Sequence, residues 1–310
     1  MKLAFVFPGQ GSQAVGMLNG YAGLPDVDKV RHEAAEVLGG EFLQLLDEGP
    51  AEQLGLTVNT QPAMVTAGIA AYRAWIASGG PKPAIVAGHS LGEYSALVAA
   101  EALAFRDCLP LVRFRAQAMQ EAVPPGQGAM AAILGLESSE VQKACEEAGG
   151  VVQAVNFNTP EQTVIAGEKA AVERAIDKCK VRGAKRAMPL PVSAPFHSSL
   201  MKPAGDKLRG QLLKMRFTAP LIPVLSNVDV APHARPDDIR EALVRQASSA
   251  VRWVETIRRM LAEGVTHIAE CGPGKVLAGM TKRIAPEIQG YALSDRASLE
   301  QALAAVKGGA

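Results

Sequence analysis

The chain has 310 residues, of which 48% are hydrophobic and 20% are charged, and its formal net charge is +1. This composition supplies a large apolar core and excludes a chain that stays disordered. The small net charge argues against nucleic-acid binding and membrane-surface binding, which usually require a basic excess. The length allows one large α/β domain or two domains of unequal size.

The four cysteines stand far apart, form no Cys-x-x-Cys pair and have no histidine nearby at zinc-ligand spacing. We therefore expect a reducing compartment and no metal site. The apolar run from Leu3 to Phe7 ends at Pro8 and is too short for the core of a signal peptide, so it is predicted to be the first strand. No segment reaches the ~18 uninterrupted apolar residues of a membrane span. These features predict a cytoplasmic protein.

Strand and helix signals alternate through the first part of the chain. A loop with two glycines, 8–13, follows the first strand and lets a ligand approach the backbone. Two helices with a proline in the first turn are expected next. Thr60 is expected to cap the first, which runs over 63–77, and Asp107 to cap the second, which stops at Pro124.

The turn Gly88-His89-Ser90-Leu91-Gly92 lies between the apolar run 84–87 and an uninterrupted helical stretch, 93–102. A Gly-x-Ser-x-Gly turn in this context holds the serine on a strained bend and lifts its hydroxyl above the strand ends. The following helix directs its N-terminal amides and positive dipole end at charge that develops beside Ser90. An isolated match would more often be a glycine turn with an N-capping serine, but this context predicts a nucleophile.

Six elements follow between 129 and 190 in the order βαββαβ, which is the ferredoxin-like pattern. The expected strands are 129–134, 151–156, 163–166 and 185–190, and the expected helices are 138–148 and 169–182. We interpret residues 127–191 as a small ferredoxin-like domain inserted into a larger one. Residues 1–126 and 192–310 are then predicted to form an α/β-hydrolase-like domain with a parallel sheet and a nucleophile elbow.

The rest of the chain returns to helices and short strands. A helix to about Met215, a strand at 223–226, and helices at 237–246 and 254–263 are expected. The last strand is predicted at 266–270, followed by a glycine turn and a helix from Lys275, which repeats the strand, turn and helix order of a parallel sheet.

A serine hydroxyl needs a base within hydrogen-bond reach. Of the five histidines, His197 is favoured because its loop follows the small domain and can return to the carboxyl edge of the sheet. His89 adjoins Ser90, but its side chain should point away. The acids between Ser90 and His197 mostly lie on predicted helices, so a backbone carbonyl or an amide side chain is left to orient the imidazole.

Short motifs occur in a fixed order along the chain: Phe7 to Ser12, Gly88 to Glu93, Arg113 to Met119, Val155 to Pro160, Pro195 to His197 with Leu200 to Pro203, Ser226 to Val228, Gln246 with Val251 to Trp253, and Gly272 to Leu277. Together they resemble the malonyl-CoA:acyl carrier protein transacylases and the acyltransferase domains of fatty-acid and polyketide synthases. The resemblance runs nearly from end to end.

The resemblance implies that Ser90 is the acylated nucleophile and His197 its base, and that Gln246 helps to hold the histidine. It also implies an oxyanion hole made of the backbone N–H groups of Gln10 and Leu91. The Ser90 turn by itself predicts the same arrangement, with one N–H donor from the residue after the nucleophile and one from a glycine-rich loop.

Two further residues match substrate-binding positions of the family. Arg115 matches the arginine that forks onto the free malonyl carboxylate, a bidentate pairing that lysine cannot reproduce. Helical periodicity alone does not choose between Arg113 and Arg115, and either could be a solvated arginine. Phe196 is the residue type of malonyl-preferring synthase domains, where a bulky ring crowds an α-methyl branch; core packing is its alternative role.

The implied reaction is a ping-pong transfer of malonyl from malonyl-CoA through Ser90 to the phosphopantetheine thiol of acyl carrier protein, without a metal or redox cofactor. A serine esterase or thioesterase and a catalytically idle scaffold of a synthase complex are the alternatives. Since acyl carrier proteins are acidic, a local basic patch is predicted to dock them. Its residues are Lys178, Lys180, Arg182, Lys185 and Arg186. The enzyme is predicted to be a monomer.

Overall fold

A computed structural model describes residues 1–192 and 194–308. Its larger sheet has five parallel strands in the order β7-β2-β1-β8-β9. These strands are β1 (Leu3–Phe7), β2 (Ile85–Gly88), β7 (Val224–Leu225), β8 (His267–Cys271) and β9 (Gln289–Leu293). The three central strands end in register, so the loops that follow them leave the same edge of the sheet.

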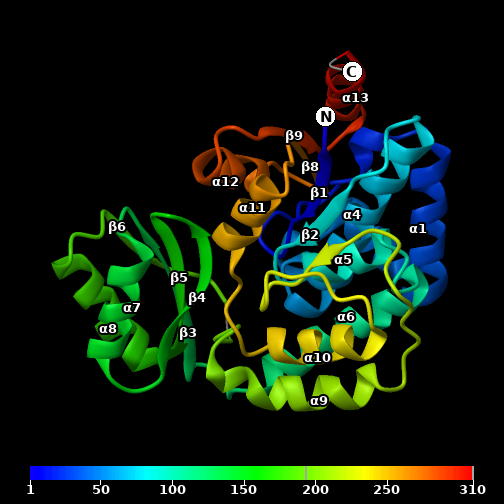
Figure 1. Cartoon of the computed structure of the whole chain (residues 1–310). Helices are drawn as coiled ribbons and strands as arrows, with labels where there is room; N and C mark the ends of the chain where they lie inside the picture. The colour runs from blue at the N-terminus through cyan, green and yellow to red at the C-terminus, as the bar shows by residue number, and fades with distance from the viewer. Residues whose placement is uncertain (193, 309–310) are drawn as a thin grey trace.

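Helices cover this parallel sheet on both sides, with α1, α4 and α6 grouped beside β1 and β2 in Figure 1. Most of α4 is buried, as is typical of a helix at the centre of a large apolar core. The helices of this part are α1 (Pro25–Leu38), α2 (Gly40–Glu48), α3 (Ala51–Leu54), α4 (Thr57–Ala77), α5 (Gly92–Ala99), α6 (Phe105–Glu121), α9 (Lys202–Leu212), α10 (Pro236–Gln246), α11 (Trp253–Ala262), α12 (Val276–Ile284) and α13 (Arg296–Gly308).

The second sheet is antiparallel, with the order β4-β5-β3-β6, and it stands beside the first with α11 between them (Figure 1). Its strands are β3 (Gly128–Leu134), β4 (Val152–Thr159), β5 (Gln162–Glu168) and β6 (Arg186–Pro189). Two helices, α7 (Ser138–Ala148) and α8 (Lys169–Val181), pack against one face of it. The chain therefore follows the expected βαββαβ order. Together the two sheets make a mixed α/β fold.

The two faces of the antiparallel sheet contact different partners, because successive side chains of a strand point to opposite sides. Ala131 and Ile133 of β3 pack with α7 and α8 in one apolar cluster. Met130 and Ala132 belong to another cluster, against which Phe196 also packs. The second face is therefore the one that meets the loop carrying His197.

Several predicted element boundaries were wrong. Helix α4 begins at Thr57 and α6 at Phe105, earlier than the expected caps Thr60 and Asp107. Both starting residues are buried, so packing extends each helix beyond what the proline position suggests. The strand at 266–270 is not the last one, because β9 and α13 follow it.

Candidate active site

Ser90 occupies a sharp turn between β2 and α5, with a φ of 53° in the left-handed region. The flanking glycines leave no space for a side chain. A Cβ built on Gly88 would lie 1.8 Å from the carbonyl carbon of Gly92, and one on Gly92 would lie 2.0 Å from the carbonyl oxygen of Phe7. Glycine at both positions therefore lets the turn close, and the turn holds the serine in a conformation that costs energy.

His197 lines the same cavity, and its Nε2 lies 2.7 Å from Ser90 Oγ. Its Nδ1 lies 2.9 Å from the main-chain carbonyl oxygen of Gln246. Because a carbonyl only accepts hydrogen bonds, Nδ1 carries the proton and Nε2 presents its lone pair to the serine hydroxyl. His197 also has a left-handed backbone, with a φ of 66°.

Burial and the nearby Arg115 charge lower the pKa of His197 to about 3. The imidazole is therefore neutral at physiological pH, which is the form that can accept a proton from serine. The backbone carbonyl of Gln246 orients the imidazole. The sequence had left a backbone carbonyl and an amide side chain as the two possibilities.

The side chain of Gln246 has a separate set of partners. Its Nε2 donates to the carbonyl oxygen of Ser90 at 3.0 Å and to Glu93 Oε2 at 2.7 Å. Its Oε1 accepts from the Arg115 guanidinium at 2.9 Å. Gln246 therefore holds His197 through its main chain and holds the elbow and Arg115 through its amide.

Arg115 is 2% exposed and enters the same cavity from α6. Its guanidinium donates to three neutral oxygens: Gln61 Oε1 at 3.1 Å, Ser90 Oγ at 3.2 Å and Gln246 Oε1 at 2.9 Å. Burial lowers its pKa, although neighbouring groups oppose this. A buried guanidinium held by uncharged oxygens next to a serine can pair with an anionic group of a ligand. Arg113 lines a different cavity, so the structure distinguishes the two arginines.

Gln10 and Leu91 both line the cavity. Within the described ranges 1–192 and 194–308, neither main-chain N–H donates a hydrogen bond. The Gln10 side chain is turned toward Thr57, with Nε2 3.3 Å from Thr57 Oγ1. Both N–H groups are therefore unpaired in this part of the chain, which is compatible with the predicted oxyanion hole.

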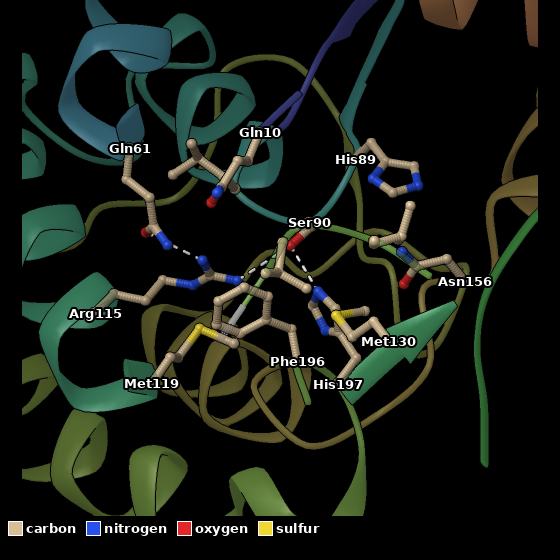
Figure 2. A pocket seen from close by; sticks show the side chains of 13 residues that line it. Gln10, Gln61, His89, Ser90, Arg115, Met119, Met130, Asn156, Phe196 and His197 are labelled. Atoms are coloured by element: carbon tan, nitrogen blue, oxygen red, sulfur yellow. Dashed lines mark hydrogen bonds between the residues drawn. The ribbon is translucent and has the colours of Figure 1, made fainter. Parts of the chain in front are cut away.

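Figure 2 shows the cavity, with Arg115 and His197 approaching Ser90 from different directions. Its volume is about 130 Å³, several times the ~10–15 Å³ that one water needs, so it can hold a small acyl group. Apolar side chains form much of the cavity lining. They are Met119, Met130, Leu190, Val192 and Phe196.

His89 points away from the nucleophile, as predicted, and its Nε2 lies 2.8 Å from Asn158 Oδ1. Three other buried residues at the site have a role that was not predicted, namely Gln61, Glu93 and Asn227. Glu93 and Asn227 belong to motifs named above, and this membership could have indicated a role at the site. Gln61 belongs to no such motif. Asn227 supports the elbow directly, since its side chain accepts from Ser90 N at 2.7 Å and donates to Gly88 O at 2.6 Å.

The basic residues predicted to dock a carrier protein divide between two elements. Lys178 and Lys180 lie on α8 and Arg182 follows it, on the face of the antiparallel sheet opposite the cavity. Two of these cations are in ion pairs, namely Lys180 with Asp177, and Arg182 with Glu140 and Glu147. Lys185 and Arg186 are exposed at the start of β6.

Among residues 1–192 and 194–308, no three His, Cys, Asp or Glu side chains group closely enough to bind a metal ion. No helix in this part of the chain is both long and apolar enough to span a membrane.

Known proteins are similar to this chain in sequence and in fold. A family model described as an acyl transferase domain matches residues 4–292. The malonyl CoA-acyl carrier protein transacylase of Escherichia coli K12 is 54% identical over 97% of this chain and 99% of its own length.

Two solved structures align over almost the whole chain. The acyl-carrier-protein S-malonyltransferase of Burkholderia pseudomallei has a TM-score of 0.96 and 60% identity, covering 98% of this chain and 99% of that one. A malonyl-transacylase in complex with its type II PKS acyl-carrier protein has a TM-score of 0.96 and 49% identity, with the same coverage. With the serine, histidine and arginine arranged as described, the chain belongs to the acyl transferase domain family and is an acyltransferase.

Proposed function

We propose that the enzyme transfers the malonyl group of malonyl-CoA to the phosphopantetheine thiol of acyl carrier protein through a malonyl ester on Ser90. The observation that carries this proposal is the contact of Ser90 Oγ with both His197 Nε2 and the buried Arg115 guanidinium. The names of the relatives, which include malonyl transacylases and an acyl carrier protein complex, support the same substrates.

Acylation begins when Ser90 Oγ attacks the thioester carbon and His197 Nε2 takes the hydroxyl proton. The carbonyl oxygen becomes an oxyanion and accepts hydrogen bonds from the N–H groups of Gln10 and Leu91. Collapse of this intermediate breaks the carbon–sulfur bond. The CoA sulfur leaves as a thiol with the proton from His197, and a malonyl ester remains on Ser90.

The second half of the reaction reverses these roles. His197 Nε2 takes the proton of the carrier's phosphopantetheine thiol, and the sulfur attacks the ester carbon. The same two N–H groups hold the oxyanion, and Ser90 Oγ leaves with the proton. These steps require neither a metal nor a redox cofactor, because they consist only of proton transfer and acyl exchange.

Arg115 is proposed to select a carboxylated acyl chain. When malonyl binds, its carboxylate pairs with the guanidinium that contacts Gln61, Ser90 and Gln246 in the free enzyme. Phe196 is half-buried at the cavity and is proposed to crowd an α-branched acyl group.

The carrier is proposed to dock at the basic residues near β6 and α8. Within that set we favour Lys185 and Arg186, because β6 continues through Leu190 and Val192 into the cavity wall.

Reversing both charges should slow transfer to the carrier and flatten its salt dependence while acylation by malonyl-CoA is spared. The double variant Lys180→Glu, Arg182→Glu is compared with it, and it should slow transfer less, because these two cations are paired within the chain. Equal transfer by both variants and the wild type at low salt would place docking elsewhere.

The proposed organisation is a large α/β-hydrolase-like unit, 1–126 and 192–310, with an inserted ferredoxin-like unit, 127–191. The separate apolar cluster under α7 and α8 supports this division. We further propose a cytoplasmic monomer.

The function is tested by supplying malonyl-CoA with holo acyl carrier protein and measuring malonyl-carrier and free malonate together. Transfer is expected to exceed hydrolysis by a wide margin. Free malonate as the main product would indicate a thioesterase, and no consumption of malonyl-CoA would indicate an idle scaffold.

A further inference from the structure

Glu93 is a buried acid in the first turn of α5, three residues after the nucleophile and 3% exposed. Its Oε2 accepts from the main-chain N–H of Asn227 at 3.0 Å and from Gln246 Nε2 at 2.7 Å. It does not line the cavity, so the reaction described above gives it no task.

The contacts of Glu93 fix which way the Gln246 amide faces. Nε2 of Gln246 lies between two groups that accept hydrogen bonds, Glu93 Oε2 and the carbonyl oxygen of Ser90. The NH₂ end must therefore point toward them, because it is the donor end of the amide. The oxygen end is left to face Arg115, 2.9 Å from the guanidinium.

If the Gln246 amide turned over, its NH₂ group would face the guanidinium, which also has only donors. Arg115 would lose an acceptor inside a buried site, where an unpaired polar group is costly. The position of Arg115 thus depends on an acid that it does not need to touch.

We propose that Glu93 is a positioning residue that sets the preference for a carboxylated acyl group by fixing the Gln246 amide, which in turn holds Arg115. The inference rests on the proposed function, in which Arg115 binds the malonyl carboxylate. In this proposal Glu93 helps to hold the Arg115 side chain in place and takes no part in proton transfer.

Glu270 provides a matched control. It is a fully buried glutamate in β8, and burial raises the pKa of both Glu93 and Glu270 to about 7. Its carboxylate accepts from the N–H of Ala278 at 2.8 Å, in α12. Substituting Glu270 therefore removes a buried acid of the same kind without touching Gln246.

The experiment measures the rate constant for acylation by malonyl-CoA and by acetyl-CoA, using the intact mass of the full-length enzyme in quenched samples. Glu93→Leu is expected to lower the malonyl-to-acetyl ratio about tenfold or more, the effect of a lost buried hydrogen bond. Glu93→Gln should keep most of the ratio, because its amide oxygen can accept from the same two donors. Glu270→Leu should keep the ratio.

Glu93→Asp keeps the charge but shortens the side chain by one methylene, so it should lower the malonyl-to-acetyl ratio in part. This variant replaces Glu93→Leu in the test if Glu93→Leu does not fold. An unchanged ratio in Glu93→Leu, or a ratio that survives in Asp but not in Gln, would overturn the inference. A wild type that does not distinguish malonyl from acetyl would instead overturn the proposed function.

Discussion

Two strand, turn and helix units leave the same edge of the parallel sheet. One joins β2 to α5 through Ser90, and the other joins β8 to α12 through Gly272 and Gly274. Each contains a buried glutamate whose pKa is raised to about 7 by burial. By glycine content and chain order the two units are alike.

The units differ in what meets the helix N-terminus. In the β8 unit, the carboxylate of Glu270 accepts from the first amides of α12, including that of Ala278. In the β2 unit, Glu93 points to Gln246 and Asn227, and the N–H of Leu91 has no acceptor among the described residues. The first amides of α5, those of Gly92, Glu93 and Tyr94, also donate, but to main-chain carbonyls of the turn itself. The Leu91 N–H just before the helix is therefore the group left to bind a developing anion. We therefore predict that the unpaired Leu91 N–H and the left-handed serine make the first unit the reactive one.

The largest expected effect comes from removing the base, His197, which contacts the Ser90 unit. His197→Ala should lower the acylation rate constant by roughly 10⁴- to 10⁶-fold. Gln246→Ala should lower it less, by about 10- to 100-fold, because the main-chain carbonyl that orients His197 remains. Quenched-flow mass measurements give both rate constants. A folded His197→Ala variant that is acylated as fast as the wild type would contradict this role of His197.

Arg115→Ala should remove the other partner of Ser90. The bound malonyl carboxylate would be left buried and unpaired, which costs about 3 to 5 kcal/mol by analogy with a broken buried ion pair. Acetyl-CoA has no such charge and should lose far less. The values to compare are kcat/KM for both substrates in both proteins. Equal losses would exclude Arg115 from substrate selection.

The turn glycines should differ in their contribution to stability. Gly92→Ala brings a Cβ within 2.0 Å of a backbone oxygen, so we expect a loss of about 3 kcal/mol or more in the free energy of unfolding. Gly274→Ala meets only Ser12 at 3.7 Å, and its φ of +83° should cost about 1 to 2 kcal/mol. Urea unfolding with an unchanged m-value measures both. The reverse order would contradict the steric account of the Ser90 turn.

The smallest effect is a pH dependence. The folded chain does not protonate His197 until about pH 3, whereas the unfolded chain binds that proton below about pH 6.5. The stability that neutral His197 contributes is therefore present above pH 6.5 and lost as the pH falls toward 3, by up to about 1.4 kcal/mol per pH unit. The free energy of unfolding of the wild type, minus that of His197→Gln, should fall between pH 6.5 and 5. A constant difference would show that the imidazole is not held neutral.

Local patterns predicted the parts of the molecule that depend on local sterics. The Ser90 turn follows from its glycines, and the βαββαβ order follows from alternating apolar periods. Helices α1 to α3 and strand β9 were not predicted, and all four contribute residues to the core. Helix α1 does have a typical local start signal, since Pro25, Asp26 and Asp28 stand in its first turn. The roles of Glu93 and Gln61 also escaped prediction, because each depends on contacts between segments far apart in the chain.

The central claim is that Ser90, and no other nucleophile, carries the acyl group. It is tested by mixing the enzyme with malonyl-CoA and locating the adduct by peptide mass, with Ser90→Ala as the control. One malonyl group on the peptide containing Ser90, absent from the folded variant, is the expected result. All four cysteines are buried, so none should be modified. An adduct on a cysteine, or an undiminished adduct in Ser90→Ala, would contradict the account.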